Sequence, residues 1–357
     1  TEEMLELSSL IGGKSDFTWN ADESKAVISS DWRSGASAMI YMAATRSNLF
    51  LLDIESESFT RLTELGEKNA HCVLPKWSGA NTVMYLYTSI TDGMQRNAIC
   101  ETDVVSGESA NVADLFNDEG RVTTVYSWDS FGETIYYTAF SFSGKTGLYA
   151  SDFRALPEDA RCLVDILSDL IDTQKHPYSR EGFSRVELAP GGKWACLTVL
   201  DSRVIKRDFP LSDSAELPQS DPSNAVSVSV RRGEKWVPCH NVYLYDLESG
   251  TLTDPFTDPA LNPAKAVVTG ACFTGDGNSL LCAVFGDDGD WTTDDFGRAA
   301  FYYVSLDDFT AVRAFDAEIA ANHWFPYGIT LLDDSTVCIR TDNPPLYQAQ
   351  LFLPFVK

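Results

Sequence analysis

The sequence predicts an all-β protein built from repeated four-stranded sheets, and three observations support this prediction. A unit of two short apolar strands joined by a polar turn recurs along the 357 residues, at 16–30, 74–89, 125–140, 185–200, 270–285 and 328–342. Apolar and polar residues alternate within these strands, as half-buried strands require. The turns are rich in Gly, Asp, Asn and Ser, which tolerate the backbone angles of tight hairpins.

Each unit is completed by a second hairpin. These hairpins lie at 48–64, 97–114, 147–165, 241–258 and 300–316, and the last copy, 346–357, ends after the third strand of its unit. Four strands repeated every roughly 45–60 residues, apart from a longer fourth unit, are typical of a β-propeller. We therefore predict a single propeller domain over residues 1–357, with six blades at 14–64, 70–116, 121–165, 183–258, 267–316 and 325–357.

The strands of each blade are lettered A to D in chain order, with A innermost. Trp19, Trp77 and Trp128 end strand A in the first three blades, and Leu188 and Phe273 take this place later. We expect these side chains to pack between adjacent blades.

Two segments depart from the repeat. Residues 166–182 are expected to form a short helix before blade 4. Residues 201–240 are an insertion between strands B and C of blade 4, and the second half of the insertion predicts a hairpin that turns at 231–234. This arm is either a surface decoration or a contact for a partner.

The end of the chain, "RTDNPPLYQAQLFLPFVK" (340–357), leaves blade 6 one strand short. Residues 3–11 would supply the missing outer strand and close the ring if they form a strand. If they form a helix, the end is an exit into a further domain, which is the interpretation we favour.

Composition excludes several classes of partner. Hydrophobic residues make up 44% of the chain and the formal net charge is −25, so a real core is expected while nucleic acid is repelled. No apolar run approaches the roughly 18–20 residues that span a bilayer, and no signal peptide is recognisable, so no membrane partner is predicted.

The eight cysteines are scattered and form no C-x-x-C pair. They are interpreted as mostly free, buried thiols of a cytoplasmic protein. Cys272 and Cys282 flank a turn, and a disulfide between them across the hairpin is an alternative.

No residue is predicted to be catalytic and no cofactor is expected, because the G-x-S-x-G, H-E-x-x-H, P-loop and G-x-G-x-x-G motifs are all absent. The loop 285–298 between strands B and C of blade 5 is strongly acidic. It is read first as a solvated loop, and Asp287, Asp288 and Asp290 are weak candidates for Ca²⁺ ligands. Arg298 is a candidate to pair with one of these carboxylates. Alternatively, the acids, including Asp290, and Trp291 receive a cationic group such as a peptide N-terminus.

His71, His176 and His323 are expected in loops that join strand D of one blade to strand A of the next. Such loops surround one mouth of the channel, where Trp324 also falls. These junctions precede blades 2, 4 and 6, and that separation disfavours joint ligation of a metal. No metal site is therefore predicted, and these residues remain candidates for binding a substrate or partner.

The repeat "NLFLLDIESESFTRLTE" (48–64), with "NVYLYDLESGTLTDPFTD" (241–258), resembles the WD40-like repeat of TolB-type proteins. It also resembles the propeller domain of the prolyl oligopeptidase family of serine peptidases, particularly the acylaminoacyl-peptidase type, whose propeller exit is similar to "RTDNPPLYQAQLFLP". In that family the catalytic triad lies in an α/β-hydrolase domain, and no segment of this chain matches that domain. The resemblance implies that the propeller gates or binds the peptide substrate.

Three functions therefore stay open. The first is a non-catalytic propeller that gates or binds peptides, with an α/β-hydrolase domain as its partner. The second is a stand-alone TolB-like propeller that binds a protein or peptide. The third is a metal-dependent propeller enzyme such as a polysaccharide lyase, because propeller-type oligogalacturonate lyases have a similar architecture.

Overall fold

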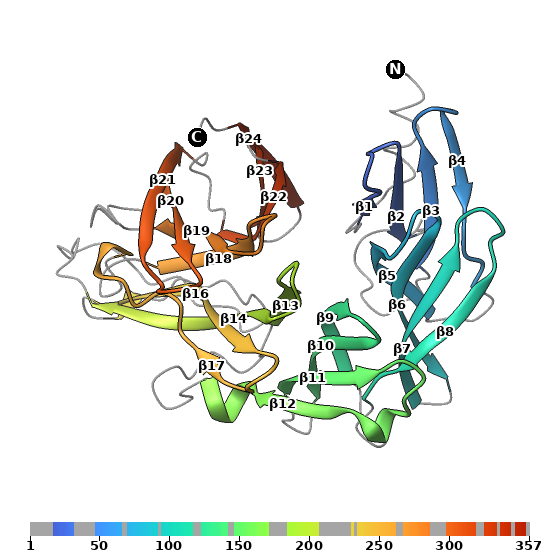
Figure 1. Cartoon of the computed structure of the whole chain (residues 1–357), viewed down its shortest axis with the longest axis horizontal. Helices are drawn as coiled ribbons and strands as arrows, with labels where there is room; N and C mark the ends of the chain where they lie inside the picture. Colours follow the sequence, from blue (N-terminus) through green and yellow to red (C-terminus); the bar gives the residue numbers. More distant parts are fainter. Residues whose placement is uncertain are drawn as a thin grey trace. The chain divides into compact units, whose positions relative to one another are not determined.

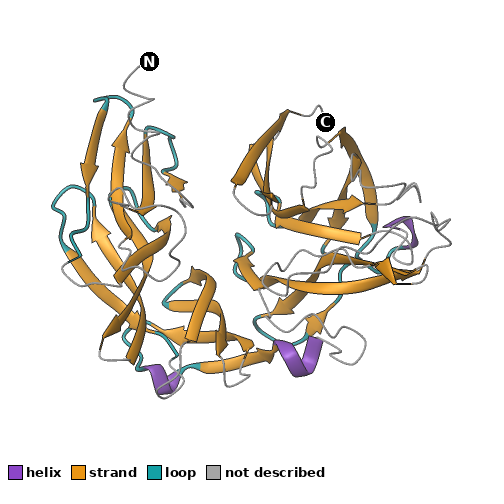
Figure 2. Ribbon diagram, turned by 180° about the vertical axis from the view of Figure 1, so that it is seen from behind, coloured by secondary structure: helices purple, strands orange, loops and turns teal. Residues whose placement is uncertain are grey.

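The computed structural model describes most of the chain as β-strands. The described residues are 17–31, 47–65, 70–91, 94–116, 123–141, 146–170, 184–206, 230–231, 234–261, 267–285, 298–318, 325–333, 336–343 and 347–354. Figure 2 shows that strands dominate this part and that helical structure is confined to short turns. These are Pro157–Asp159, Ile166–Leu170 and Pro259–Leu261, and none of them is an α-helix.

The chain divides into two compact units, residues 1–163 and 164–357. Unit 1 begins with an eight-stranded sheet made of two antiparallel groups of four strands, termed the first and second sheets, which one parallel bridge joins (Figure 1). The first holds β1 (Phe17–Trp19), β2 (Lys25–Asp31), β3 (Ser47–Asp53) and β4 (Ser58–Arg61). The second holds β5 (Ala70–Trp77), β6 (Thr82–Thr91), β7 (Met94–Asp103) and β8 (Ser109–Asp114).

A third four-stranded sheet completes unit 1, and its outermost strand leads into unit 2. Its strands are β9 (Thr123–Phe131), β10 (Thr134–Ser141), β11 (Thr146–Asp152) and β12 (Arg161–Asp165). The unit boundary falls within β12, which is followed at once by the helical turn Ile166–Leu170. The helix expected over 166–182 is described only in this first turn, since 171–183 lie outside the described residues.

Unit 2 contains two further sheets of the same kind and a smaller last one. The strands are β13 (Ser184–Leu188), β14 (Trp194–Lys206), β15 (Val230–Arg231), β16 (Glu234–Asp246) and β17 (Leu252–Thr253), then β18 (Val267–Phe273), β19 (Ser279–Phe285), β20 (Arg298–Ser305) and β21 (Ala311–Glu318), and finally β22 (Phe325–Asp333), β23 (Thr336–Asn343) and β24 (Tyr347–Pro354). The last sheet pairs three strands in the order β22-β23-β24 within the described residues. Residues 3–11, which were expected to form either a closing strand or a helix, lie outside the described part.

Strands β14 and β16 are the longest, with 13 residues each. They stay in register from Trp194↔Asp246 to Lys206↔Glu234, well beyond the length of the other sheets. The short β15 pairs with the start of β16 through Arg231↔Glu234, so the backbone turns at the predicted place.

The apolar side chains fill the space between consecutive sheets. In unit 1, one core cluster joins residues of the first two sheets, including Val27, Leu49 and Val83, and another joins the second and third, including Ile99 and Trp128. In unit 2, a third cluster joins the sheets of β13–β17 and β18–β21. Sheets stacked face to face in this way need an apolar side chain on both faces, which explains the nearly continuous apolar runs of β10 and β19.

The turns between the third and fourth strands of three sheets share one hydrogen-bonding pattern. Asp53, Asp103 and Asp246 each end their third strand, and one carboxylate oxygen of each accepts backbone N–H groups of the following turn. In every case the donor three residues later, such as Ser106 N at 2.8 Å from Asp103, belongs to a serine. An aspartate at this position therefore sets the hairpin turn, which is the structural reason that the motif recurs.

None of the cysteines with described side chains forms a disulfide. Cys72, Cys196, Cys272 and Cys282 are buried, as predicted, whereas Cys162 is exposed. The alternative of a Cys272–Cys282 disulfide is wrong, because the register places Cys282 opposite Ala271 rather than opposite Cys272.

Candidate functional site

The candidate site predicted from the sequence is the end of the sheets where strand B meets strand C and strand D leads to the next strand A. His71 is the predicted site residue whose side chain the structure describes. It is the second residue of β5 and pairs in parallel with Ser47, the first residue of β3. Ser47 Oγ and His71 Nδ1 are 3.1 Å apart and share a hydrogen bond, so the imidazole links the first two sheets.

The same junction contains a second contact between sheets. Ser29 of β2 donates a hydrogen bond of 2.7 Å to the carbonyl of Cys72. Ser29 and Ser47 are both about 3% exposed, so these polar groups meet away from water. Burial of polar groups is tolerated only when they are hydrogen-bonded, which gives both serines a structural role.

The next junction, between the second and third sheets, uses side-chain amides at the equivalent place. Gln95 binds both backbone groups of Thr123, its Nε2 donating to the carbonyl at 2.6 Å and its Oε1 accepting from the N–H at 3.0 Å. Asn97 Nδ2 donates to the same carbonyl at 2.9 Å. The Gln95 side-chain amide thus makes the two hydrogen bonds to Thr123 that the backbone of a neighbouring strand would otherwise make at the start of β9.

At the opposite end of the sheets, tryptophans connect successive inner strands. Trp77 Nε1 donates to the carbonyl of Thr18 at 3.1 Å, and Trp128 Nε1 donates to that of Leu74 at 3.0 Å. Leu74 lies at a register shift in β5 with a positive φ of 53°, outside the regular strand pairing. The expectation that these side chains pack between blades is confirmed for Trp77, Trp128 and Phe273, whereas Trp19, at 41% exposed, is not buried between them.

Charge supports the contact between the second and third sheets. Lys76 Nζ lies 3.0 Å from Asp129 Oδ1 and 5.5 Å from the centre of the Trp128 ring. In unit 2 a backbone donor replaces the indole, because Phe273 N donates to Glu187 Oε1 at 3.4 Å. In these three pairs of neighbouring sheets, strand A of one sheet is therefore tied to strand A of the previous one by a polar contact near its end.

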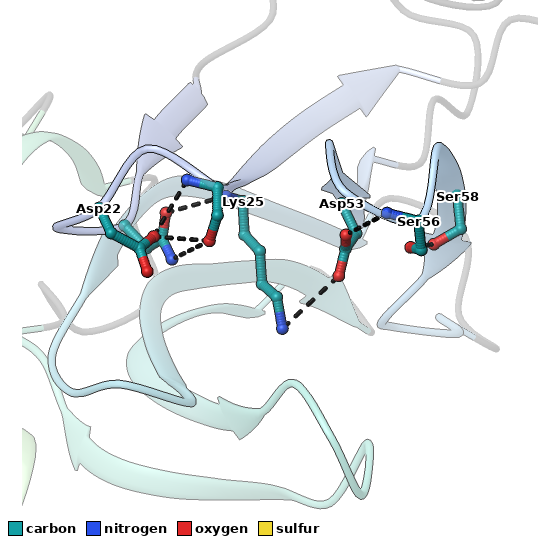
Figure 3. Close-up of polar contacts among 7 residues, drawn as sticks. Asp22, Lys25, Asp53, Ser56 and Ser58 are labelled. Carbon is teal, nitrogen blue, oxygen red and sulfur yellow. Dashed lines mark hydrogen bonds and ion pairs between the residues drawn. The ribbon is translucent and has the colours of Figure 1, made fainter.

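The turns at this end of the first sheet are also ordered by hydrogen bonds (Figure 3). Asp22 accepts from the backbone N–H of Ser24, and Lys25 N donates to Asn20 Oδ1 at 2.9 Å. Lys25 Nζ reaches Asp53 Oδ2 at 3.6 Å, joining the two turns of the sheet, as Figure 3 shows. Hydrogen bonds from Ser24 and from Ser56 hold the pKa of Asp22 and Asp53, respectively, below the usual range.

Among the other predicted site residues, Arg298 is the one that lies within the described residues. Arg298 begins β20, where its backbone pairs with Glu318, and nothing is described of its side chain. The remaining candidates lie outside the described residues: Asp287, Asp288, Asp290, Trp291, His176, His323 and Trp324. The predicted rim site thus stays a prediction. The expectation that His71 lies in a loop between strands D and A is wrong, because it is the second residue of β5, paired with Thr88 and Ser47.

The described part of the chain shows neither a metal-binding cluster nor a membrane-spanning helix. No three side chains among its His, Cys, Asp and Glu residues are grouped as a metal site. None of its helical segments has the length and apolar character needed to cross a membrane.

Comparison with known structures bears on the fold. An oligogalacturonate lyase in complex with manganese is similar to this chain with a TM-score of 0.51 and 10% identity, over 94% of this chain and 71% of the lyase. The chain has a propeller-like fold. No family model matches the sequence, and no curated protein matches it.

Proteins of the predicted peptidase family are also among the similar structures. The acylaminoacyl peptidase of Pyrococcus horikoshii has a TM-score of 0.47 at 10% identity, over 94% of this chain and 43% of the enzyme. The β-propeller domain of the trilobed protease from Pyrococcus furiosus has a TM-score of 0.41 at 9% identity, over 94% and 90%. The chain spans less than half of the P. horikoshii enzyme.

Sequence reasoning missed Ser47, Gln95 and Asn97 as junction residues. Each lies in the first residues of a third strand, within "SNLFLL" or "QRNAIC". A polar residue at the start of an otherwise apolar strand was the available signal.

Proposed function

We propose that this chain is a non-catalytic propeller that gates or binds peptides at the end of the sheets bearing the B–C and D–A loops. The observation that carries the proposal is how its polar side chains are used at the sheet junctions. Ser47–His71, Gln95–Thr123 and Lys76–Asp129 all join neighbouring sheets. A scaffold fixed in this way can present its end loops as a preorganised binding surface.

The loop 285–298 is the proposed contact for the peptide N-terminus. Its carboxylates, with Asp290 as the principal one, would pair with an α-ammonium group, and the Trp291 ring would add a cation–π contact. Arg298 follows this loop at the start of β20, and His71, His176, His323 and Trp324 are the rim residues that complete the candidate set. The net charge of −25 favours a cationic ligand group over an anionic one.

Fluorescence anisotropy with a short labelled peptide tests this role. The peptide has uncharged side chains and a free N-terminus, and its N-acetylated form is the matched control. We expect the free peptide to bind about tenfold more tightly, and the variant Asp290→Asn/Trp291→Ala to remove this difference. Equal affinity of the two peptides for the native chain contradicts the proposal.

We also propose the finer architecture. The sheets correspond to six blades, and residues 201–240 are an extension of blade 4, which the long pairing of β14 with β16 supports. Replacing 207–229 by a short Gly-Ser linker should leave the thermal midpoint within about 3 °C. A larger loss shows that this segment is part of the fold rather than an addition to it.

The partner in this proposal is an α/β-hydrolase domain, and the compartment is the cytoplasm, in keeping with the free thiols. The resemblance of 340–357 to a propeller exit supports that partner. The natural reading frame tests it, since a G-x-S-x-G motif within about 300 codons after Lys357 is expected. A stop codon close to Lys357 would instead favour the stand-alone, TolB-like binding protein.

A metal-dependent lyase is the second candidate, and the likeness to the manganese-bound oligogalacturonate lyase favours it. Metal analysis of the protein after incubation with manganese and desalting distinguishes the two functions. Stoichiometric metal, together with cleavage of oligogalacturonate, supports the lyase. Absence of both removes it.

A further inference from the structure

Unit 1 exposes large apolar side chains at the turns that join strand A to B and strand C to D. These are Trp19, Ile54, Val105, Phe131 and Leu156, with exposed fractions from 41% for Trp19 to 73% for Val105. Each of the three sheets contributes at least one of them. Single exposed apolar residues are ordinary, but a repeated set at one end of a unit marks a surface for interaction.

All five belong to the same end of unit 1. In a four-stranded antiparallel sheet, the A–B and C–D turns lie at one end and the B–C turn at the other. The parallel pairing of Ser47 with His71 gives the first two sheets the same direction. The Lys76–Asp129 ion pair, near the ends of β5 and β9, does so for the second and third sheets.

The same turns are strongly acidic. Three of them each carry two exposed carboxylates: Asp22 and Glu23, Glu55 and Glu57, Glu158 and Asp159. Val105 and Phe131 are likewise near the exposed Glu108 and Glu133, and Arg154 is the one basic residue in the turns 20–24, 54–57, 78–81, 104–108, 132–133 and 153–160. The apolar tips therefore sit in a negative field, which repels phosphate-bearing surfaces and attracts cations.

The turns are also held in place before any partner arrives. Asp53 and Asp103 fix the C–D turns of the first two sheets through backbone N–H groups, as described above. The A–B turn of the first sheet is fixed by Asn20 and Asp22. A preorganised surface loses little conformational entropy on binding. The binding free energy from the exposed apolar side chains is therefore not offset by the cost of ordering the turns.

We infer that the A–B and C–D turns of unit 1 form a docking surface for a basic amphipathic polypeptide segment of another protein. The apolar side chains of that segment would lie against Ile54, Val105 and Phe131, and its Lys or Arg side chains would pair with the neighbouring glutamates. This surface is distinct from the peptide site proposed above, because that site centres on the loop 285–298 of unit 2, which joins strands B and C. The inference therefore does not rest on the proposed function.

The test uses the full chain and a labelled twelve-residue peptide of lysine and leucine arranged to be amphipathic as a helix. Two matched probes replace every leucine by serine or every lysine by glutamate. We expect the lysine–leucine peptide to bind about tenfold or more tightly than either matched probe. Equal binding of the lysine–serine peptide would overturn the inference, because charge alone would then account for the affinity.

Variants locate the site. Ile54→Ser/Val105→Ser/Phe131→Ser is expected to weaken binding about tenfold or more, while Ile90→Ser and Val312→Ser, also at exposed apolar residues, change it less than about twofold. Ile90 lies at the B–C end of unit 1 and Val312 lies in unit 2, so both are outside the proposed surface. Unchanged affinity of the triple variant, with its thermal midpoint retained, overturns the inference.

A sedimentation assay with lipid vesicles tests whether the surface binds membranes instead. Vesicles of phosphatidylcholine with phosphatidylserine should not co-sediment with the chain, since the carboxylates repel anionic headgroups. Co-sedimentation that is lost in the triple variant would assign the surface to membranes and overturn the inference. The Asp290→Asn/Trp291→Ala variant should bind the lysine–leucine peptide normally, so failure of the rim site leaves this result unaffected.

Discussion

The indole N–H of Trp128 donates a hydrogen bond of 3.0 Å to the carbonyl of Leu74, two residues that belong to the inner strands of neighbouring sheets. Trp77 makes the equivalent bond to Thr18 one sheet earlier. Beyond the single bridge of Ser47 with His71, the described residues of β5 have no partner strand on the side away from β6, so a carbonyl group such as that of Leu74 needs another donor. Tryptophan at the end of strand A supplies both the donor and the apolar surface between sheets.

Replacing Trp128 by phenylalanine tests the value of this bond. The side chain is only 2% exposed, so Trp128→Phe leaves the Leu74 carbonyl without its donor and creates a small cavity. We expect the free energy of unfolding to fall by about 2 kcal/mol, measured by urea denaturation followed by circular dichroism. Trp19→Phe, at a site 41% exposed, should change it by less than about 0.5 kcal/mol. Equal effects of the two variants would show that the indole bond is not stabilising.

Gly270 tests the close approach of β18 to β22. A Cβ at this position would lie 3.3 Å from Ile329 Cγ1 and 3.7 Å from the Ile329 backbone nitrogen. Gly270→Ala should therefore destabilise the protein by about 1–3 kcal/mol. Gly275→Ala is the matched control, because its Cβ would meet nothing within 4 Å. Gly270→Ala should cost less when Ile329 is already alanine, and a cost unchanged in that background would place its origin elsewhere.

The aspartate turns predict an acid limit to stability. Hydrogen bonds from Ser56, Ser106 and Ser249 hold the pKa of Asp53, Asp103 and Asp246 below the ordinary value. A lowered pKa in the folded state gives stability that is present above the unfolded pKa, about 3.9, and is lost as the pH falls through the folded pKa. Thermal midpoints should therefore be nearly constant above about pH 5 and fall below about pH 4.

Two substitutions at Asp103 separate charge from hydrogen bonding. Asp103→Asn keeps an acceptor oxygen for the turn and should make the acid decline shallower. Asp103→Ala removes the acceptor and should lower the thermal midpoint at neutral pH as well. An acid decline that is as steep in Asp103→Asn as in the native chain would refute the role given to this carboxylate.

Thiol labelling tests the cysteine environments. Burial raises the pKa of Cys72 and Cys282 to about 12, so both should resist iodoacetamide at neutral pH, while the exposed Cys162 should react. After denaturation without reductant, mass spectrometry should find both Cys272 and Cys282 alkylated. A Cys272–Cys282 cross-link in that experiment would contradict the free thiols of the structure.

The sequence was sufficient to predict the repeated hairpins, because their strands and turns depend on neighbours along the chain. The predicted pair at 16–30, for example, matches β1 and β2, and the turn at 231–234 matches the pairing of Arg231 with Glu234. Tight turns are encoded by residues such as Asp53 and Ser56, three positions apart.

Contacts between sheets were harder to predict. Gln95 and Thr123 are 28 residues apart and Trp128 and Leu74 are 54 apart, and no local pattern links either pair. Cys272 and Cys282 looked like cross-strand partners, yet the pairing of β18 with β19 offsets them by one residue. The rim site also depends on loops from several blades, so spacing along the chain could nominate His71 and Asp290 but could not bring them together.

The central claim is that this chain binds peptides without chemically changing them. In the most direct test, a mixture of short peptides is incubated with the purified chain immobilised on a resin. Mass spectrometry then analyses the peptides that the resin retains and those that it does not. We predict that peptides with a free N-terminus are retained and recovered at unchanged mass. Recovery of cleaved peptides, or retention that is the same for N-acetylated peptides, would contradict it.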